Sequence, residues 1–414
     1  MALQRNIILS VLGAIVQRGA GLLGGIYVAR YLGGEVLGGY ALILANIYMF
    51  GAFATFGITP VASKFVSENR GVNDSIIINI IATTFIISSL FGLVLSLFIY
   101  SFSEYIALHL YSRPEFELYL KISAPSILFM ALSACNVGIL SGYEKFRIVS
   151  KHNAVNGIMS TLLIILFGTM WEVKGIAIAI LLSQFIFFAV TLVPVLPYLN
   201  GLSKSVKSRL FMNQWSIMAS FSIPHFLTGL SQGLTNWLCI LFLSKTDGGL
   251  NELALFHIAN QWYSLILFLP NVAATVLLPY LSREGSSSLV NIIKAYAVAI
   301  VAAVGLLVFA TPLISTLYGE VLYEKGLILI ITFVTGGVVA FKSPIEQSLL
   351  AHNKVWLLFK INMIFLSVFL VGAYTLLNMG TLGVLSARLI GYVLFCFMIF
   401  SAYLFMYGKK QKYD

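Results

Sequence analysis

The sequence predicts an all-α polytopic membrane protein of about twelve transmembrane helices, arranged as two similar halves of six helices each. Three observations support this fold class. Of the 414 residues, 59% are hydrophobic and 10% are charged, whereas an ordinary soluble domain carries about 25% charged residues. Apolar runs long enough to cross a bilayer recur along the whole chain. Segments of the first half also have counterparts in the second half.

The spans of the first half follow the apolar runs and end at polar, glycine or proline positions. They are predicted near residues 7–28, 36–58, 75–100, 118–140, 153–170 and 175–197. The first run is longer than the roughly 7–15 apolar residues of a signal-peptide core, so we expect a retained helix. A basic linker that contains Lys204, Lys207 and Arg209 follows the sixth span.

Six further spans are predicted near residues 213–243, 253–278, 289–312, 326–349, 355–377 and 381–406. The expected organisation is therefore a bundle over residues 1–198, a linker over 199–212 and a second bundle over 213–414. Three pairs of segments match in the same order: 41–48 (ALILANIY) with 255–262 (LFHIANQW), 143–146 (YEKF) with 352–355 (HNKV), and 175–179 (GIAIA) with 383–387 (GVLSA). Repeated halves of this kind commonly enclose a central site in transporters.

The orientation follows from the Lys and Arg residues of the alternate loops, because these charges resist translocation. Of the 25 Lys and Arg residues, sixteen lie on one side of the predicted membrane, five on the other and four within spans. We therefore expect a multi-pass protein of the bacterial inner membrane with both termini in the cytoplasm. The net charge of +10 follows from this bias, and no nucleic-acid partner is expected. The three cysteines fall in apolar spans and are expected in the core rather than in disulfides.

Charged residues within the spans are the best indication of a functional site, because a charge at the centre of a helix costs about 2.5–3.5 kcal/mol. Four are basic and one is acidic: Arg18, Lys121, Lys342, Arg388 and Glu346. Arg18 lies about eleven residues into its span, roughly 17 Å deep, on one helix face with Ala14, Gly21 and Gly25. These small residues leave room beside the guanidinium; alternatively, the two glycines pack a neighbouring helix whose carbonyls Arg18 binds.

For the remaining embedded charges, ion pairing or snorkelling is a simpler alternative to a role in a functional site. Lys342 precedes Glu346 by one helical turn, the spacing of an internal ion pair. Arg388 and Lys121 are closer to the ends of their spans and could reach the membrane surface by snorkelling. Among the uncharged polar residues of the spans we add His225, Gln232, Asn236 and Asn260 as further site residues, although most such groups make ordinary interhelical hydrogen bonds.

The excess of embedded positive charge predicts a cavity that binds an anion, such as a phosphate or pyrophosphate headgroup. Arg18, Lys342 and Arg388 are the residues expected to line it. Arginine suits phosphate because its planar guanidinium donates two parallel hydrogen bonds. The apolar part of such a lipid would remain in the bilayer while its head crosses, as in a flippase.

Other function classes are less compatible with the sequence. A membrane-embedded polysaccharide polymerase or ligase would need an acid–base constellation in an outer loop, and no loop carries one. The H-E-x-x-H and G-x-x-x-x-G-K-[ST] motifs are absent, so neither metalloprotease chemistry nor ATP hydrolysis is expected. The chain is therefore predicted to be no enzyme and to need no cofactor or metal. A cation-coupled drug exporter would use buried carboxylates, of which only Glu346 is present.

Three segments resemble the polysaccharide transporter family, which includes the Wzx-type O-antigen flippases: residues 29–40 (ARYLGGEVLGGY), 140–147 (LSGYEKFR) and 269–283 (LPNVAATVLLPYLSR). The wider superfamily also contains multidrug exporters and peptidoglycan-lipid flippases. The resemblance implies two six-helix bundles that form a V-shaped cleft, alternating access, and an undecaprenyl-pyrophosphate-linked saccharide as substrate. It also implies functional association with proteins of polysaccharide assembly.

Overall fold

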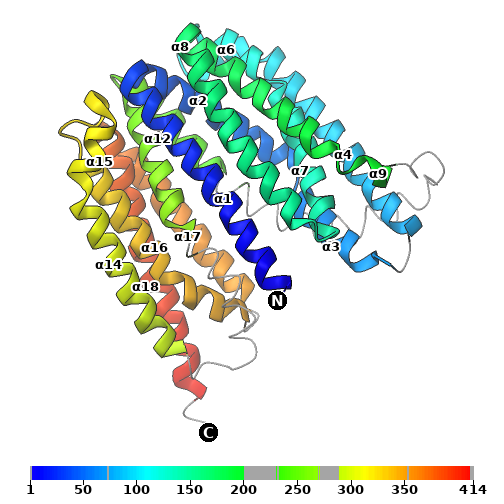
Figure 1. The fold of residues 1–414 in the computed structure, drawn as a ribbon. Helices are drawn as coiled ribbons and strands as arrows, with labels where there is room; N and C mark the ends of the chain where they lie inside the picture. Colours follow the sequence, from blue (N-terminus) through cyan, green and yellow to red (C-terminus); the bar gives the residue numbers. More distant parts are fainter. Residues whose placement is uncertain are drawn as a thin grey trace. The chain divides into compact units, whose positions relative to one another are not determined.

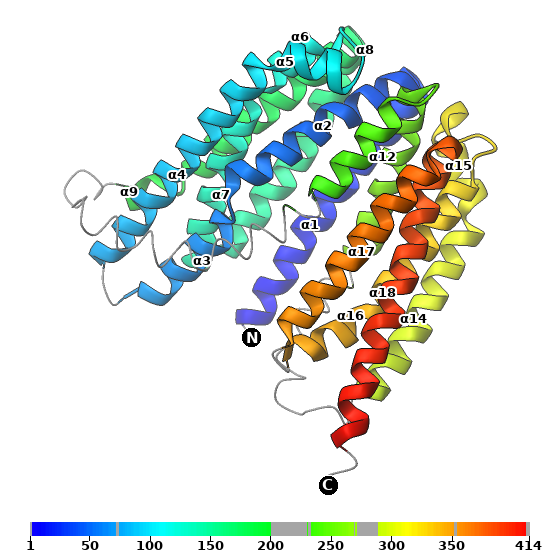
Figure 2. The ribbon, with the colours of Figure 1, turned by 180° about the vertical axis from the view of Figure 1, so that it is seen from behind.

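The computed structural model describes residues 2–71, 74–199, 230, 233–268, 270, 289–351 and 354–410. Every regular element among these residues is a helix (Figures 1 and 2). The residues group into two compact units. One comprises residues 1–32 and 39–241, and the other comprises residues 33–38 and 242–414. The predicted linker lies almost wholly outside the described residues, so its boundaries stay a prediction.

The N-terminal unit begins with α1 (Ala2–Tyr27), which continues into a π-helical turn, Val28–Leu32. The second predicted span corresponds to α2 (Gly34–Thr55). A further helix that was not predicted, α3 (Ile58–Asn69), follows it after positive φ angles at Phe56 and Gly57. Next come α4 (Asp74–Ser101), the short α5 (Ser103–Tyr105) and a π-helical turn, Ile106–Leu110. The unit continues with α6 (Phe116–Ser123), α7 (Ser126–Gly142), α8 (Phe146–Leu192) and α9 (Leu196–Leu199).

Small residues allow the helices of this unit to approach one another closely. Helix α1 packs along α8, where a Cβ on Gly24 would lie 3.1 Å from Thr161 and a Cβ on Gly157 would lie 2.5 Å from the Gln17 backbone. Helix α7 packs against α3 and α4 around a buried apolar cluster that includes Cys135. None of the described cysteines is in a disulfide. Cys135 and Cys239 are buried, which confirms their predicted place in the core, whereas Cys396 is partly exposed.

Helix α8 contains two of the predicted spans, because its backbone leaves the helical conformation at Trp171 and Glu172. Glu172 has φ 49° and ψ −130°. In the second unit, Gly380 has nearly the same conformation, φ 59° and ψ −140°, at the start of α18 (Gly380–Lys410). Three residues after each turn, Gly175 and Gly383 lie so close to a carbonyl oxygen of the preceding helix that a Cβ would overlap it. The two segments matched in sequence thus share one local geometry.

The C-terminal unit contains α12 (Gly249–Ile266), α14 (Leu289–Phe309), α15 (Thr311–Leu317), α16 (Leu327–Ala351), α17 (Val355–Thr375) and α18, with 3-10 turns at Gly319–Val321 and Leu377–Met379. Within it, α16 contacts α12, α14 and α18, and α18 contacts α17. The glutamate Glu252 of α12 joins two elements: its carboxylate accepts a hydrogen bond from the Thr381 backbone N–H at 2.5 Å, at the N-terminus of α18, where a negative charge is stabilised.

The described residues contain eight helices long and apolar enough to cross a membrane, or nine if the bent pair of α14 and α15 forms one span. The molecule is thus an all-helical polytopic membrane protein, as predicted. The kinked α8 counts once among the eight although it corresponds to two predicted spans. Parts of the predicted spans 213–243 and 253–278 lie outside the described residues, so the total of twelve stays a prediction.

Candidate functional site

Arg388 lies on α18 and is enclosed by the side chains of neighbouring helices in the C-terminal unit. Its Nη1 donates a hydrogen bond to Asn260 Oδ1 at 2.8 Å, and the residue is 6% exposed. The rings of Phe256, Tyr263 and Phe369 lie 5.0, 5.4 and 5.5 Å from the guanidinium carbon. The snorkelling alternative for Arg388 is therefore wrong, because hydrogen bonding and cation–π contacts hold the charge inside the helix packing.

The spacing of residues along α12 explains how this enclosure forms. On α12, Phe256, Asn260 and Tyr263 follow one another at i, i+4 and i+7, which places them on one face. That face presents an amide oxygen between two rings to the guanidinium. Sequence reasoning named Asn260 and Arg388 separately but missed the rings, although the periodic spacing of Phe256 and Tyr263 around Asn260 was a visible signal.

Lys342 lies on α16 and forms the predicted ion pair with Glu346. The Nζ to Oε2 distance is 2.5 Å, and Lys342 is 9% exposed. The ring of Phe395 on α18 lies 4.3 Å from the ammonium group. The ion pair predicted from the i, i+4 spacing is therefore confirmed. Glu346, the only acidic residue predicted within a span, already has a cationic partner.

A row of aromatic rings connects the two cations of the C-terminal unit. Phe369, next to Arg388, stacks on Phe365 with ring centroids 6.0 Å apart. Phe365 in turn packs edge to face against Phe395 at 6.0 Å, and Phe395 lies beneath Lys342. Polarisable rings stabilise cations that have left water, so α16, α17 and α18 carry a continuous array that accommodates positive charge within the membrane.

Arg18 lies in the N-terminal unit on α1 and is exposed. The face of α1 that packs against α8 includes Gln17 and Gly24, whereas a Cβ added to Gly21 would meet nothing within 4 Å. The space beside the guanidinium that the sequence predicts is therefore present at Gly21. Gly25, the other glycine of the packing alternative, is buried, so the functional and the packing interpretation of Arg18 both stay predictions.

The remaining predicted site residues do not join the two cations of the C-terminal unit among the described residues. His225 and Gln232 lie outside the described residues. Asn236 is half-buried in the short apolar helix Gly233–Ser244. The fourth embedded cation, Lys121, forms an i, i+4 ion pair with Glu117 at 2.5 Å and is partly exposed. Among the described residues no group of three or more His, Cys, Asp or Glu side chains could hold a metal ion.

Two buried tyrosines, one in each unit, form polar contacts that sequence reasoning missed. The Tyr111 hydroxyl donates to Asn46 Oδ1 at 2.9 Å and accepts from Trp237 Nε1 at 3.0 Å. The Tyr318 hydroxyl accepts from Trp262 Nε1, also at 3.0 Å. Burial raises the pKa of both phenols, so the hydroxyls stay protonated at neutral pH. The partners are 56 to 126 residues apart in sequence, and no local pattern predicts them.

The fold is similar to that of several solved transporters. It matches an inward-facing conformation of a multidrug resistance MATE family transporter of the MOP superfamily with a TM-score of 0.77, at 17% sequence identity, over 98% of this chain and 99% of that one. It matches the lipid II flippase MurJ in its inward closed conformation with a TM-score of 0.75, at 20% identity, over 97% of this chain and 87% of that one.

Sequence comparison gives a more specific relationship. Residues 3–285 match the model of the polysaccharide biosynthesis protein family. The EPS I polysaccharide export inner membrane protein EpsE of Ralstonia nicotianae is 23% identical over 167 residues, which cover 38% of this chain and 38% of that protein. The predicted location, a multi-pass protein of the inner membrane, agrees with the description of this relative.

The fold and its membrane-spanning helices define the class of this protein: a polytopic membrane protein with the fold that the MATE transporter and MurJ share. Within that class, the chain belongs to the polysaccharide biosynthesis protein family. The resemblance seen in the sequence is thereby confirmed.

Proposed function

We propose that this protein is a flippase that moves undecaprenyl-pyrophosphate-linked saccharide repeat units from the cytoplasmic to the periplasmic leaflet. Transport would proceed by alternating access between two six-helix bundles that form a V-shaped cleft, with both termini in the cytoplasm. Family membership supports a role in polysaccharide assembly, and the relative named as a polysaccharide export protein supports movement across the inner membrane. The fold shared with a lipid II flippase is compatible with a lipid-linked substrate.

The observation that carries this proposal is the way in which the embedded cations are held. Lys121 and Lys342 are neutralised by Glu117 and Glu346. Arg388 instead has an amide and aromatic rings as its partners, and none of the ion pairs among the described residues includes it. A buried positive charge surrounded by neutral groups favours an anionic ligand, because a counter-charge offsets the cost of its desolvation.

In this proposal Arg18 and Arg388 contribute the positive potential of the transport path, with Arg18 reaching the headgroup first because it is exposed. Lys342, whose charge Glu346 offsets, stays a predicted lining residue of the path. Asn260 orients Arg388, while His225, Gln232 and Asn236 stay lower-ranked site residues. A drug exporter is less well supported, because Glu346, the carboxylate it would use for coupling, is already paired with Lys342. Proteins of polysaccharide assembly are the proposed functional partners.

The test is transport of a fluorescent pyrophosphoryl-lipid saccharide in vesicles that contain equal amounts of each variant. A charge-assisted hydrogen bond contributes about 1.5–3 kcal/mol, so Arg18→Ala should slow transport roughly tenfold or more. Arg18→Lys should lose less, since it retains the charge without the planar group. Lys121→Ala is the matched control, because it removes an embedded cation that is already neutralised.

Equal transport by the wild type and Arg18→Ala, at equal protein in the membrane, would remove Arg18 from the mechanism. Equal sensitivity of Lys121→Ala and Arg18→Ala would show that loss of any embedded cation is damaging, and the proposed anion path would then have no support. A strain that lacks the protein should lose surface polysaccharide. A drug-sensitive strain with intact polysaccharide would instead favour the exporter.

A further inference from the structure

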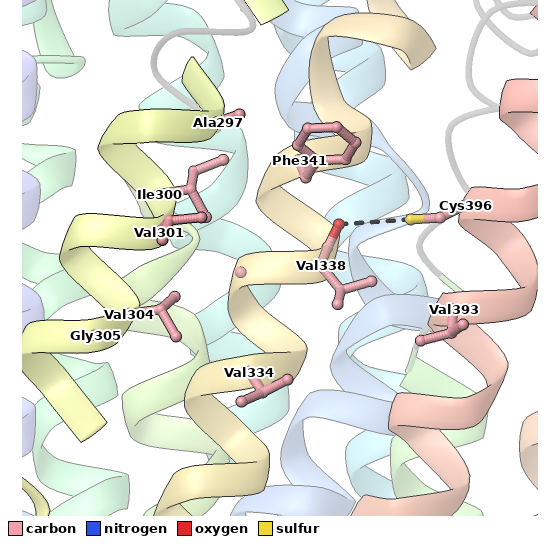
Figure 3. Close-up of a pocket in the computed structure, with 11 residues that line it drawn as sticks. Ala297, Ile300, Val301, Val304, Gly305, Val334, Val338, Phe341, Val393 and Cys396 are labelled. Atoms are coloured by element: carbon pink, nitrogen blue, oxygen red, sulfur yellow. Dashed lines mark hydrogen bonds between the residues drawn. The ribbon is translucent and has the colours of Figure 1, made fainter. Parts of the chain in front are cut away.

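A hollow of about 600 Å³ lies between α14, α16 and α18 of the C-terminal unit (Figure 3). Its lining is apolar and includes Ile300 and Val304 of α14, Val334 and Phe341 of α16, and Val393 and Cys396 of α18. The Cys396 thiol already donates a hydrogen bond to the Val338 carbonyl oxygen at 3.5 Å. The volume falls within the range of about 300–1,000 Å³ typical of ligand pockets, and the side chains that line it have no free polar group for a ligand.

Two glycines in the lining have different roles. A Cβ on Gly337 of α16 would lie 2.8 Å from Val304, so this glycine allows α14 and α16 to approach each other. A Cβ on Gly305 of α14 would meet nothing within 4 Å. The absence of a side chain at Gly305 therefore does not serve helix packing. It leaves the hollow open.

The hollow lies near the middle of its helices. Its lining spans residues 297–305 of α14, 334–341 of α16 and 393–396 of α18, and each range is well inside its helix. Val301 and Val393, both in the lining, are 72% and 52% exposed, so the hollow reaches the surface of the chain. At the middle of a membrane span that surface faces hydrocarbon, and an apolar chain is the ligand that can enter.

The hollow also adjoins an embedded cation. Phe341, in the lining, immediately precedes Lys342, and Cys396 immediately follows Phe395, whose ring lies 4.3 Å from the Lys342 ammonium group. An apolar chain in the hollow would therefore lie on one side of the α16–α18 contact, with the charged pair of Lys342 and Glu346 close by. Because Glu346 offsets the charge of Lys342, the hollow itself selects for an apolar chain.

We infer that this hollow binds a segment of the polyprenyl chain of the lipid-linked substrate, an inference that rests on the proposed function. Each leaflet accounts for half of the roughly 30 Å hydrocarbon core, so a phospholipid chain brings little more than its end to the depth of the hollow. A polyprenyl chain is longer than one leaflet and passes through the middle of the bilayer. Binding there keeps the chain attached to the C-terminal unit while the headgroup crosses.

The test uses the full chain in phosphatidylcholine vesicles and undecaprenyl pyrophosphate that carries a diazirine in its chain. Photolabelled residues are mapped by mass spectrometry, and phosphatidylcholine with a diazirine in its acyl chain serves as the second probe. We expect the polyprenyl probe to label α14, α16 and α18 around the hollow. Unlabelled undecaprenyl pyrophosphate should compete, whereas additional phosphatidylcholine should not.

Gly305→Trp should reduce this labelling at least about tenfold, because the indole would occupy the hollow. Leu306→Trp is the matched control: Leu306 is the next residue of the same helix, is 68% exposed and lies outside the lining, so labelling should stay at the wild-type level. If Gly305→Trp does not fold, as judged by its elution in detergent, Gly305→Leu fills part of the same space and should give a smaller loss.

Labelling that is equally strong with the phosphatidylcholine probe and insensitive to competition would overturn the inference, because bulk lipid would then fill the hollow. Labelling unchanged in the folded Gly305 variants would overturn it as well. The readout is independent of transport. If undecaprenyl pyrophosphate competes for labelling but the protein transports no pyrophosphoryl saccharide, the polyprenyl site is supported and the flippase proposal is refuted. If the protein transports the saccharide but the hollow is not labelled, the flippase proposal is supported and the polyprenyl site is refuted.

Discussion

The contact between Asn260 and Arg388 allows a quantitative test of how the buried cation is held. Asn260→Leu removes the oxygen that accepts from Arg388 at 2.8 Å while keeping a similar side-chain size. A hydrogen bond to a charged group contributes about 1.5–3 kcal/mol, and at 6% exposure Arg388 has little water to replace it. An ordinary interhelical hydrogen bond in a membrane averages about 0.6 kcal/mol. We therefore expect Asn260→Leu to lower the free energy of unfolding by about 1.5–3 kcal/mol.

The assay is equilibrium unfolding in mixed detergent and dodecyl sulfate micelles, followed by circular dichroism, for the wild type, Asn260→Leu, Arg388→Met and the double variant. The double-mutant cycle should give a coupling energy of about 1.5–3 kcal/mol, because Asn260 has no charge to satisfy once Arg388 is replaced. Asn378→Leu makes the same chemical change at an exposed position and should change stability by less than about 0.5 kcal/mol. A coupling energy near zero, or an Asn260→Leu loss no larger than that of Asn378→Leu, would refute the reasoning.

Two further predictions concern packing and buried polar groups. Gly383→Ala should lower the thermal unfolding midpoint in detergent, because its Cβ would overlap the Leu376 carbonyl at a cost of about 1–3 kcal/mol. The control, Gly305→Ala, should leave the midpoint unchanged or slightly raised. Equal midpoints for the two variants would contradict the described turn. Tyr111→Phe removes two side-chain hydrogen bonds and Tyr318→Phe removes one. At about 0.5–1.5 kcal/mol each, Tyr111→Phe should be the less stable variant in chemical unfolding, and the reverse order would show that these bonds are not formed as described.

Several features of the site were predictable because they depend on local geometry. The ion pair of Lys342 and Glu346 follows from the rise and turn of a single helix, so its i, i+4 spacing was sufficient. The burial of Cys135 and Cys239 follows from their place in apolar runs. The segments matched in sequence also share a local geometry. Gly175 and Gly383 each lie against a carbonyl oxygen of the preceding segment, and this close approach requires a residue without a Cβ.

The environment of Arg388 was not predictable in the same way. Its depth in the span suggested that it could extend to the membrane surface, but the structure places it against Asn260, 128 residues earlier in the chain. Whether a long side chain snorkels or turns inward depends on which groups the neighbouring helices present, and rings from α12 and α17 stabilise the inward position. The hydrogen-bond partners of Tyr111 and Tyr318 were unpredictable for the same reason, because helix packing brings them together from distant parts of the sequence.

By itself, the sequence determined that this protein is a polytopic helical membrane protein, indicated its family and identified the positions that carry charge within its spans. Hydropathy and helical periodicity are properties of short segments, so they can be read along the chain. Only the tertiary structure decided which embedded cations are neutralised, which one lies among neutral groups, and where three helices leave a hollow. These outcomes depend on side chains brought together from distant segments, and the free energy of burying a charge is set by those neighbours rather than by the charge alone.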